Sequence, residues 1–286
     1  MPTGADGILY VVGTPIGNPA DITARALEVL AAVDLIACED TRRTGRILAA
    51  HSIRTPMLSY FEHNEVRRAA ELVDRLRRGD KIALVTDAGT PAISDPGYRL
   101  VRAAIEAGVR VTAVPGPSAV VAALSISGLP TDRFVFEGFL PAKAAARRSA
   151  LLALAHEART IVFFEAGRRL GECLTEMAAV FGADRIAVVF RELTKTYEEI
   201  VRGTLADLAS RFSREPALGE VTLVVEGARE PSADREKAPH ALDEARAVEV
   251  LREAGLSLKQ AAAAVARLTG GSRREIYQAA LRARGS

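Results

Sequence analysis

Short apolar runs alternate with amphipathic segments along the first 115 residues. The runs are rich in β-branched residues, which is typical of buried strands, and the segments between them repeat apolar positions every three or four residues, which is typical of helices. This alternation predicts βαβ units and a largely parallel sheet. The expected strands are 8–12, 35–38, 82–86 and 111–114, and the expected helices are 22–32, 41–50, 64–78 and 98–107.

A second set of strands and helices follows in the next hundred residues. Strands are expected at 134–138, 160–165, 186–190, 199–203 and 220–226, and helices at 144–155, 168–180 and 204–212. Pro115, Gly116 and Pro117 mark the boundary between the two halves and lead into a helix of small residues at 118–127. We therefore expect an α/β protein with one domain at 1–117 and a second at 118–227.

The last sixty residues differ in character from both halves. A polar stretch with two prolines, 228–239, resembles a linker. Three short amphipathic segments then predict helices at 242–254, 258–268 and 273–282, interrupted by Gly255 and Gly270. The expectation for 240–286 is a small helical appendage of helix-turn-helix type, which serves either nucleic-acid binding or packing.

Composition narrows the class of protein. With 286 residues, 49% of them hydrophobic and 26% charged, the chain is long enough for two cores. No apolar run reaches the length of a membrane span, and residues 1–8 lack the features of a signal peptide, so we expect a cytoplasmic protein. Two distant cysteines and four histidines form no metal-binding or disulfide pattern. Residues 240–286 hold eight Lys or Arg against five acidic residues, a weak indication of phosphate binding.

The connection that begins at Asp87 is unusually long for a turn between a strand and a helix. Such turns commonly take about two to six residues, whereas this one runs through Gly89, Pro91, Pro96 and Gly97 before the next helical pattern starts. In open α/β sheets, loops at the carboxyl ends of the strands line the ligand crevice. This loop is therefore the first candidate for a binding site.

Two common nucleotide-binding loops are absent. The first strand ends in GTPIGN (13–18), which lacks the GxGxxG spacing of dinucleotide-binding folds. PGPSA (115–119) precedes a helix, but no Gly-Lys-Ser/Thr follows it, which argues against an ATPase. The small residues after Ser118 indicate a helix packed closely against either a sheet or a flat ligand.

Charged residues cluster after strands in both halves. The clusters are EDTRR (39–43), EHNE (62–65), EAGRR (165–169) and RELTK (191–195). Each one alone could be an ion-pair network or a helix cap. Because four of them occur near strand ends in adjacent halves, they favour a charged crevice, and the guanidinium groups of Arg42 and Arg43 are suited to phosphate.

Six segments taken together resemble a known family. GTPIGNPADITARALEVLAAVDLIACEDTRR (13–43), YFEHNE (60–65), LVTDAGTPAISDPG (84–97), PGPSA (115–119), GLPTDRFVFEGFLP (128–141) and RELTKTYEEIVRGTL (191–205) are similar, in this order, to the ribosomal RNA small subunit methyltransferase I family. That family is part of the tetrapyrrole-methylase-like superfamily of S-adenosylmethionine-dependent enzymes. The resemblance covers residues 8 to about 227, and the C-terminal helices resemble the family's appended helix-turn-helix segment.

The resemblance implies a fold, a cofactor and a substrate. It implies two α/β domains with S-adenosylmethionine in the cleft between them, a small C-terminal helical segment, and a homodimer. The implied reaction is methylation of the ribose 2′-hydroxyl of a cytidine in the decoding region of 16S rRNA, with either naked RNA or an assembled small subunit as substrate. Residues implied around the cofactor are Pro15, Asp87, Ala88, Gly89, Thr90, Pro91, Ile93, Ser118, Ala119, Phe164, Glu165, Gly219, Glu220 and Val221.

One segment departs from the family pattern. Where relatives usually carry Pro-His-Arg, this chain has Gly167-Arg168-Arg169, so Arg169 is retained and Arg168 replaces the histidine. No role is assigned to the missing imidazole.

Phosphate contacts are expected from Arg42, Arg43, Arg133, Arg168, Arg169 and Lys195, together with the C-terminal arginines.

Methyl transfer from a sulfonium needs alignment more than activation, so proton removal from the hydroxyl is the remaining task. The carboxylates expected as general base are Glu39, Asp40, Glu65 and Glu165, with Asp95 as a further candidate.

Two alternatives stay open: a methylase acting on a small tetrapyrrole-like molecule, and a non-enzymatic RNA-binding protein. The EDTRR and EHNE segments and the basic tail favour RNA over the small molecule. The cofactor cleft would have no purpose in a simple RNA-binding protein.

Overall fold

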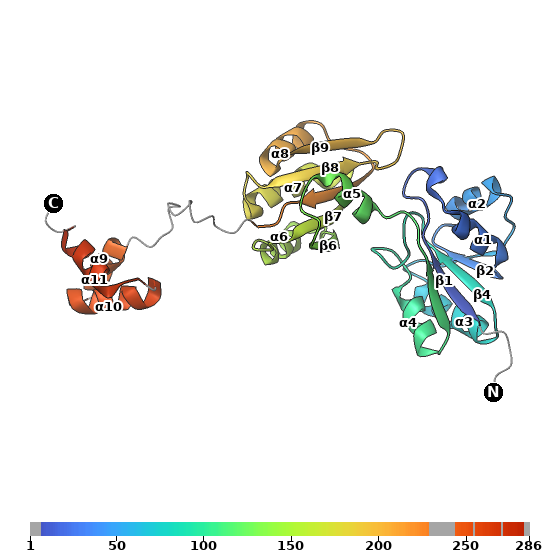
Figure 1. Cartoon of the computed structure of the whole chain (residues 1–286), viewed down its shortest axis with the longest axis horizontal. Coiled ribbons are helices and arrows are strands. Elements are labelled where there is room, and N and C mark those ends of the chain that lie inside the picture. Colours follow the sequence, from blue (N-terminus) through green and yellow to red (C-terminus); the bar gives the residue numbers. More distant parts are fainter. Residues whose placement is uncertain (1–6, 229–243, 254, 270, 283–286) are drawn as a thin grey trace. The chain divides into compact units, whose positions relative to one another are not determined.

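The chain divides into two compact units, residues 1–228 and 229–286. A computed structural model describes residues 7–228, 244–253, 255–269 and 271–282 (Figure 1). No helix within these ranges combines the length and apolar character needed to cross a membrane. The first unit contains two five-stranded sheets, and the second consists of helices.

The first sheet is entirely parallel, as the alternation of strands and helices predicts. Its strand order is β3-β2-β4-β1-β5. The strands are β1 (Ile8–Val12), β2 (Leu35–Cys38), β3 (Met57–Ser59), β4 (Lys81–Val85) and β5 (Arg110–Val114). The helices are α1 (Ala24–Ala32), α2 (Thr41–Ala50), α3 (Glu65–Arg77) and α4 (Tyr98–Glu106), with a short 3₁₀ turn η1 (Pro19–Asp21). The edge strand β3 was not predicted, because three residues are too few to show a periodicity.

Strand alternation sends successive side chains of β4 to opposite faces of this sheet. Ile82 and Leu84 pack in the core beneath α3 and α4, whereas Ala83 and Val85 pack in the core beneath α1 and α2. Figure 1 shows the two helix pairs on the two sides of the sheet. Because both faces are covered, β4 is apolar at almost every position, as buried parallel strands are.

The second sheet is mixed, with the order β6-β7-β10-β8-β9. Only β6 and β7 are parallel, and every other neighbouring pair is antiparallel. Its strands are β6 (Phe134–Phe139), β7 (Thr160–Ala166), β8 (Ile186–Arg191), β9 (Glu199–Thr204) and β10 (Glu220–Val225). Its helices are α5 (Ala119–Ser127), α6 (Ala144–Ala153), α7 (Leu170–Phe181) and α8 (Leu205–Arg214), and a 3₁₀ turn η2 (Gly167–Arg169) precedes α7.

Helices cover the two faces of this second sheet unequally. Ile161 and Phe163 of β7 point into the core formed with α6, α7 and α8. Val162 of β7 points to the other face, where α5 contributes Val120 and Leu124. The face with only one helix leaves room beside α5 for a ligand.

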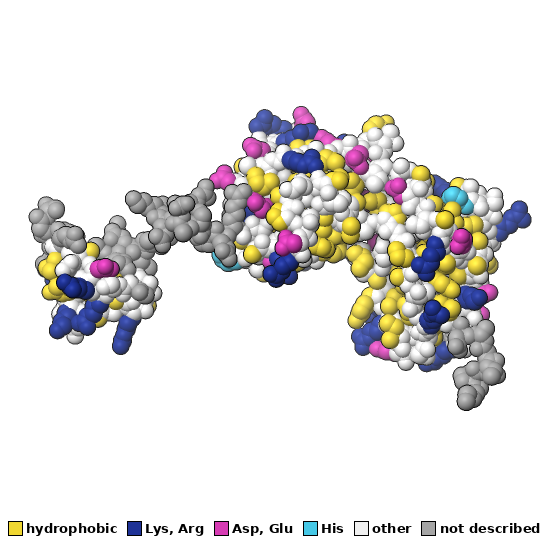
Figure 2. All heavy atoms as spheres, viewed as in Figure 1, with side chains coloured by type: hydrophobic (Ala, Val, Ile, Leu, Met, Phe, Trp, Pro, Cys, Tyr) yellow, Lys and Arg dark blue, Asp and Glu magenta, His cyan; other side chains and the backbone are white. Residues whose placement is uncertain are grey.

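The described residues of the second unit form three helices: α9 (Glu244–Glu253), α10 (Leu258–Thr269) and α11 (Arg273–Arg282). They share a small core of Val248, Ala261, Ala262, Val265, Ile276 and Ala280. Ser257 caps α10, since its Oγ accepts from Gln260 N at 3.3 Å while Gln260 Oε1 accepts from Ser257 N at 3.0 Å. The expected linker, apart from Ala228, lies outside the described residues. Figure 2 shows that charged side chains on the visible face of this unit are mainly Lys and Arg.

Two glycines allow the backbone at the end of β1 to touch the segment that follows β5. A Cβ on Gly13 would lie 2.8 Å from Gly116 Cα, and a Cβ on Gly116 would lie 2.8 Å from Gly13 O. Real Cβ atoms do not approach the backbone so closely. Side chains at either position would therefore separate the two segments.

We expect Gly116→Ala to destabilise the protein by about 1–3 kcal/mol, because backbone must move to accept the new methyl group. Gly45→Ala in α2 is the matched control. The Cβ there would meet only the end of the Met57 side chain, at 3.4 Å, and alanine favours a helix by up to about 1 kcal/mol. Midpoints of urea unfolding measured for both variants and the unmodified chain test the expectation. Equal midpoints for all three would contradict it.

Candidate functional site

A cavity of about 230 Å³ in the first unit is lined by residues from both sheets. The loops of the first sheet contribute Ile16, Ala88, Gly89, Thr90, Ile93, Ser94 and Asp95. The second sheet, α5 and the loop after β8 contribute Ser118, Ala119, Val120, Phe139, Phe164, Glu165, Phe190, Glu192, Leu193, Lys195, Glu220, Val221 and Thr222. The expected crevice between two α/β halves is thus present.

The long loop after β4 is anchored to the first loop by backbone pairing. Thr14 N donates to Gly89 O at 2.8 Å, and Gly89 N donates to Thr14 O at 3.1 Å. The Thr14 hydroxyl adds a bond to Thr86 O at 3.1 Å. Gly89 has a φ of +79°, a conformation that favours glycine. The backbone groups of Gly89 are therefore used to hold the loop against the cavity wall.

Most of the residues that the resemblance implies around the cofactor lie in the wall of this cavity. Four lie outside it: Pro15, Asp87, Pro91 and Gly219. The Asp87 carboxylate points to other partners, accepting from Asp40 N at 3.0 Å and pairing with Arg43 at 3.3 Å. Gly219 lies against the Glu192 side chain, which occupies the space that a Cβ would need.

Several wall residues were not anticipated. Phe139, Phe190 and Thr222 project from strands of the second sheet, and Ile16 and Leu193 from loops. Apolar strand residues carry no chemical signature in a sequence. Their place in the wall depends on the pairing of β10 between β7 and β8, which the order of elements along the chain does not reveal.

Carboxylates outnumber cations in the cavity wall. Asp95, Glu165, Glu192 and Glu220 face one cation, Lys195, among the described residues. The Lys195 ammonium lies 3.0 Å from both Glu192 Oε1 and Glu220 Oε2. Burial alone would lower the pKa of Lys195, but its hydrogen bonds to these carboxylates outweigh burial and raise the pKa. The wall is therefore suited to a ligand that carries positive charge.

Glu165 has a buried oxygen available to a ligand. Its Oε1 accepts from Ala166 N at 2.8 Å. Its Oε2 lies 3.2 Å from Arg169 Nη2 but has no hydrogen-bond partner within the described part of the chain. A buried acceptor of this kind is costly unless a ligand or water donates to it.

These features fit S-adenosylmethionine. The ring of Phe164 and the side chains of Ile16 and Leu193 give an apolar wall of the kind that binding sites for organic cofactors have. The sulfonium and ammonium groups match the carboxylates, and Glu165 Oε2 can accept a hydrogen bond from the cofactor.

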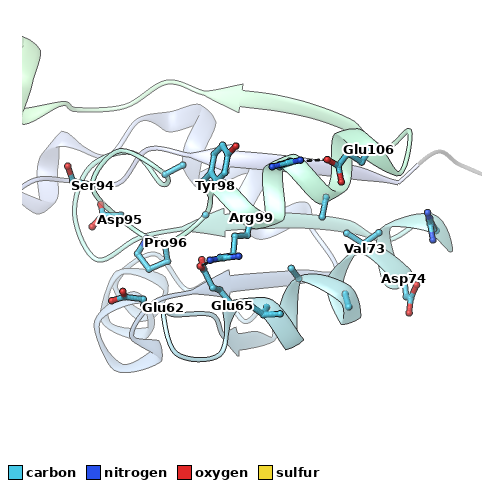
Figure 3. Close-up of a pocket in the computed structure, with 18 residues that line it drawn as sticks. Glu62, Glu65, Val73, Asp74, Ser94, Asp95, Pro96, Tyr98, Arg99 and Glu106 are labelled. Carbon is cyan, nitrogen blue, oxygen red and sulfur yellow. Dashed lines mark hydrogen bonds and ion pairs between the residues drawn. The ribbon is translucent and has the colours of Figure 1, made fainter. Parts of the chain in front are cut away.

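The structure separates the four carboxylates expected as general base. Glu165 alone among them lies in the cavity wall. Glu39 Oε2 accepts from Thr86 Oγ1 at 2.8 Å, beside the cavity. Asp40 caps α2, and its hydrogen bonds from Arg42 hold the pKa of this carboxyl well below its usual range. Glu65 pairs with Arg99 in a groove between α3 and α4 (Figure 3).

Asp95 lies where this groove meets the cavity, since it lines both. Figure 3 shows it with Ser94 on the loop at one end of the groove. Burial raises the pKa of Asp95 to about 6; a hydrogen bond from Thr86 opposes the rise, and the carboxylates of Glu39, Asp87 and Glu220 add to it. Asp95 is thus a partly buried carboxylate that changes charge near neutral pH.

Two loops of the cavity wall hold strained backbone. Ala92 and Ser94 in one loop and Glu192 and Thr194 in the other have φ between +51° and +70°. Non-glycine residues adopt this region rarely, and such residues cluster at binding sites. The second loop also contacts the loop that follows β1, since Asn18 N donates to Thr194 Oγ1 at 3.0 Å.

The residues expected to contact phosphate fall into two groups. Arg42, Arg43, Arg133 and Arg168 are exposed. Arg169 is engaged internally, because its Nη2 donates to Leu140 O at 2.9 Å and to Pro141 O at 3.2 Å. Lys195 is held in the cavity wall by the two glutamates. Within the exposed group, Arg42 pairs with Asp40 and Arg43 with Asp87, so each would meet phosphate only by exchanging that partner.

Comparison with protein families gives matches over nearly the whole chain. The family model described as "Tetrapyrrole (Corrin/Porphyrin) Methylases" matches residues 8–209. A second model, described as "RsmI C-terminal HTH domain", matches residues 239–284. The matched segments thus include the first sheet, the strands β6 to β9 of the second sheet and the C-terminal helices.

Curated relatives are similar over their full length. The chain is 49% identical to "Ribosomal RNA small subunit methyltransferase I" of Xylella fastidiosa (strain Temecula1), across 95% of this chain and 98% of the relative. It is 47% identical to the protein of the same name from Escherichia coli O157:H7, across 98% and 97%.

Solved structures share the fold. A uroporphyrin-III-C-methyltransferase from Thermus thermophilus and a cobalt precorrin-4 methyltransferase each align with a TM-score of 0.56 at 22% identity, over 78% of this chain and 95% of theirs. At this identity the likeness concerns the fold alone. The family model and the relatives that match over nearly their full length show more than the fold. The chain belongs to the tetrapyrrole (corrin/porphyrin) methylase family and, within it, to the ribosomal RNA small subunit methyltransferase I family.

Proposed function

We propose that this protein transfers the methyl group of S-adenosylmethionine, the methyl donor of its family, to the ribose 2′-hydroxyl of a cytidine in the decoding region of 16S rRNA. The observation that carries the proposal is the 47–49% identity, over nearly the whole chain, to relatives named as methyltransferases of small-subunit ribosomal RNA. The basic C-terminal helices and the exposed arginines near the cavity support an RNA substrate. The same family supports a homodimer, which light scattering would detect as twice the mass of one chain.

The cofactor supplies a methyl group already activated by its positively charged sulfur. The chain's own residues then have two tasks, alignment and proton removal. The carboxylates of Glu165, Glu192 and Glu220 hold the positively charged ligand, while the apolar wall keeps water from the reacting atoms.

We assign proton removal to Asp95. Bound S-adenosylmethionine would supply the methyl group, and the Asp95 carboxylate would take up the proton of the ribose 2′-hydroxyl. Asp95 is reached from the groove as well as from the cavity. Glu165, by contrast, has a side chain that is only 1% exposed and is held by Arg169 and its own backbone. It suits a positioning role.

The substrate is tested by incubating the full chain with labelled S-adenosylmethionine and three acceptors: undermethylated small subunits, naked 16S rRNA and porphyrin precursors. We expect label in one of the RNA-containing acceptors, at the 2′-oxygen of a cytidine after nuclease digestion. Label in the porphyrin alone would replace this proposal with a small-molecule methylase. Label in none of them, with the cofactor bound, would overturn it.

Asp95→Asn is expected to lower kcat roughly 100- to 10,000-fold in a variant that still binds the cofactor. The charged carboxylate accepts the proton, so kcat/KM of the unmodified chain, which reports the free protein, should rise with pH and level off above about 6, the pKa of Asp95. The variant should lose this rise. Asp132→Asn, an exposed site outside the cavity wall, is the matched control. A variant that keeps both its rate and its pH profile would remove Asp95 from the mechanism.

Deleting residues 240–286 should weaken RNA binding more than cofactor binding, because the helices carry cations that attract phosphate and the cavity forms within the first unit. Charge reversal at two exposed sites, Arg273→Glu with Arg274→Glu, tests the same point in the full chain. The dissociation constant for RNA, measured at several salt concentrations, should rise and depend less steeply on salt. Equal losses of RNA and cofactor binding in the folded variants would show that this segment is not an RNA-binding module.

A further inference from the structure

A ribose hydroxyl reaches the inside of a cavity most readily when its nucleotide leaves the RNA stack. Bases in a helix are stacked on both faces, and proteins that act on a single nucleotide draw it out and hold its base against an aromatic side chain. An RNA substrate, as proposed above, therefore requires a flat apolar surface where the cavity opens to solvent. The inference below rests on that proposed function.

Phe139 provides such a surface. Of the three phenylalanines in the cavity wall, Phe190 is buried, Phe164 is half-buried and Phe139 is 56% exposed. The centroid of the Phe139 ring lies 5.6 Å from that of Phe164, with the two planes tilted by 57°. Phe164 is itself packed edge-on against Phe136, at 4.9 Å. One side of the Phe139 ring is therefore supported by packed aromatic rings while more than half of the residue remains open.

An irregularity in β6 is the reason that Phe139 faces the cavity. Residues 136 and 139 are three apart and would point to opposite faces of a regular strand. The pairing of β6 with β7 shifts register between Phe136 and Gly138, and Gly138 has a φ of +65°. Both phenylalanines consequently contact Phe164. Bulges are common beside active sites, where they redirect a side chain.

Gly138 also allows β6 to approach the loop that carries Asp95. A Cβ on Gly138 would lie 2.9 Å from Ser94 Oγ, so the strand and this loop are in close contact at this point. Ser94, Asp95 and Phe139 all belong to the cavity wall. The exposed ring thus lies in the same part of the wall as the carboxylate to which we assign proton removal.

We propose that Phe139 is the stacking surface for the base of the target nucleotide, which presents the ribose 2′-hydroxyl toward Asp95. Stacking uses the face of the ring and requires no hydrogen bond, so Phe139 holds the nucleotide in place without identifying the base. The adenine of the cofactor is the other flat group that could use this ring. The experiment separates the two ligands.

The test compares the full chain with Phe139→Ala, Phe139→Leu and Phe139→Tyr, using the RNA acceptor that the unmodified chain methylates. Loss of stacking on a single base should lower kcat/KM for RNA about 5- to 100-fold in the Ala and Leu variants. Leu keeps apolar bulk without a ring face, whereas Tyr keeps the ring and should retain activity within a few-fold. The dissociation constant for S-adenosylmethionine, measured by calorimetry, should be unchanged in all three variants.

Phe134→Ala is the matched control, because it removes a ring of similar exposure (41%) from the same strand but outside the cavity wall. A fluorescent cytidine analogue at the target position adds a direct readout, since its emission is quenched when it stacks on the ring. Unchanged kcat/KM in both the Ala and Leu variants would overturn the stacking surface, as would a cofactor affinity that falls as far as RNA turnover. If the unmodified chain methylated no RNA, the proposed function itself would fail, which is a distinct result.

Discussion

The close backbone contact between Gly13 and Gly116 is the constraint on which the site depends. It brings the end of β1 against the segment that leads into α5, so the first loop of one sheet begins beside the first helix of the other. Thr14 follows Gly13 directly and pairs with Gly89, which sets the position of the long loop after β4. The positions of wall residues from three distant parts of the sequence therefore depend on one contact between backbone atoms.

Electrostatics then decides what this arrangement can hold. Asp95, Glu165 and Glu192 of the wall lie in a partly dry environment, where a charge without a partner is expensive. Lys195 satisfies Glu192 and Glu220, and Arg169 lies beside Glu165, but Asp95 faces other carboxylates and gains no cation among the described residues. A positively charged ligand relieves this imbalance. Burial, with a smaller contribution from the neighbouring carboxylates, raises the pKa of Asp95 to about 6.

Sequence reasoning identified the parts of the site that have a chemical signature. Glycines and prolines after Thr86 marked the loop, and β-branched runs marked the strands of both sheets. Periodicity does not encode strand direction, so the antiparallel position of β10, and with it Thr222 in the wall, could not be predicted. The position of Phe139 in the wall could not be predicted, because a register shift at Gly138 places Phe139 on the same face of β6 as Phe136. The side chain of Arg169 has the charge that phosphate needs, yet its place in the fold directs it to two carbonyl oxygens.

The positive-φ residues of the two wall loops have a further consequence. Each such residue costs the folded state about 1–3 kcal/mol relative to an unstrained backbone, so the strain persists only because surrounding contacts determine it. Ala92 N bonds to Pro96 O at 3.3 Å within its own loop, and Thr194 is tied to Asn18. Loops held in this way are already ordered before a ligand arrives, and little conformational entropy is lost when one binds. The binding site is therefore preorganised: the folded chain already has the shape that the ligand requires.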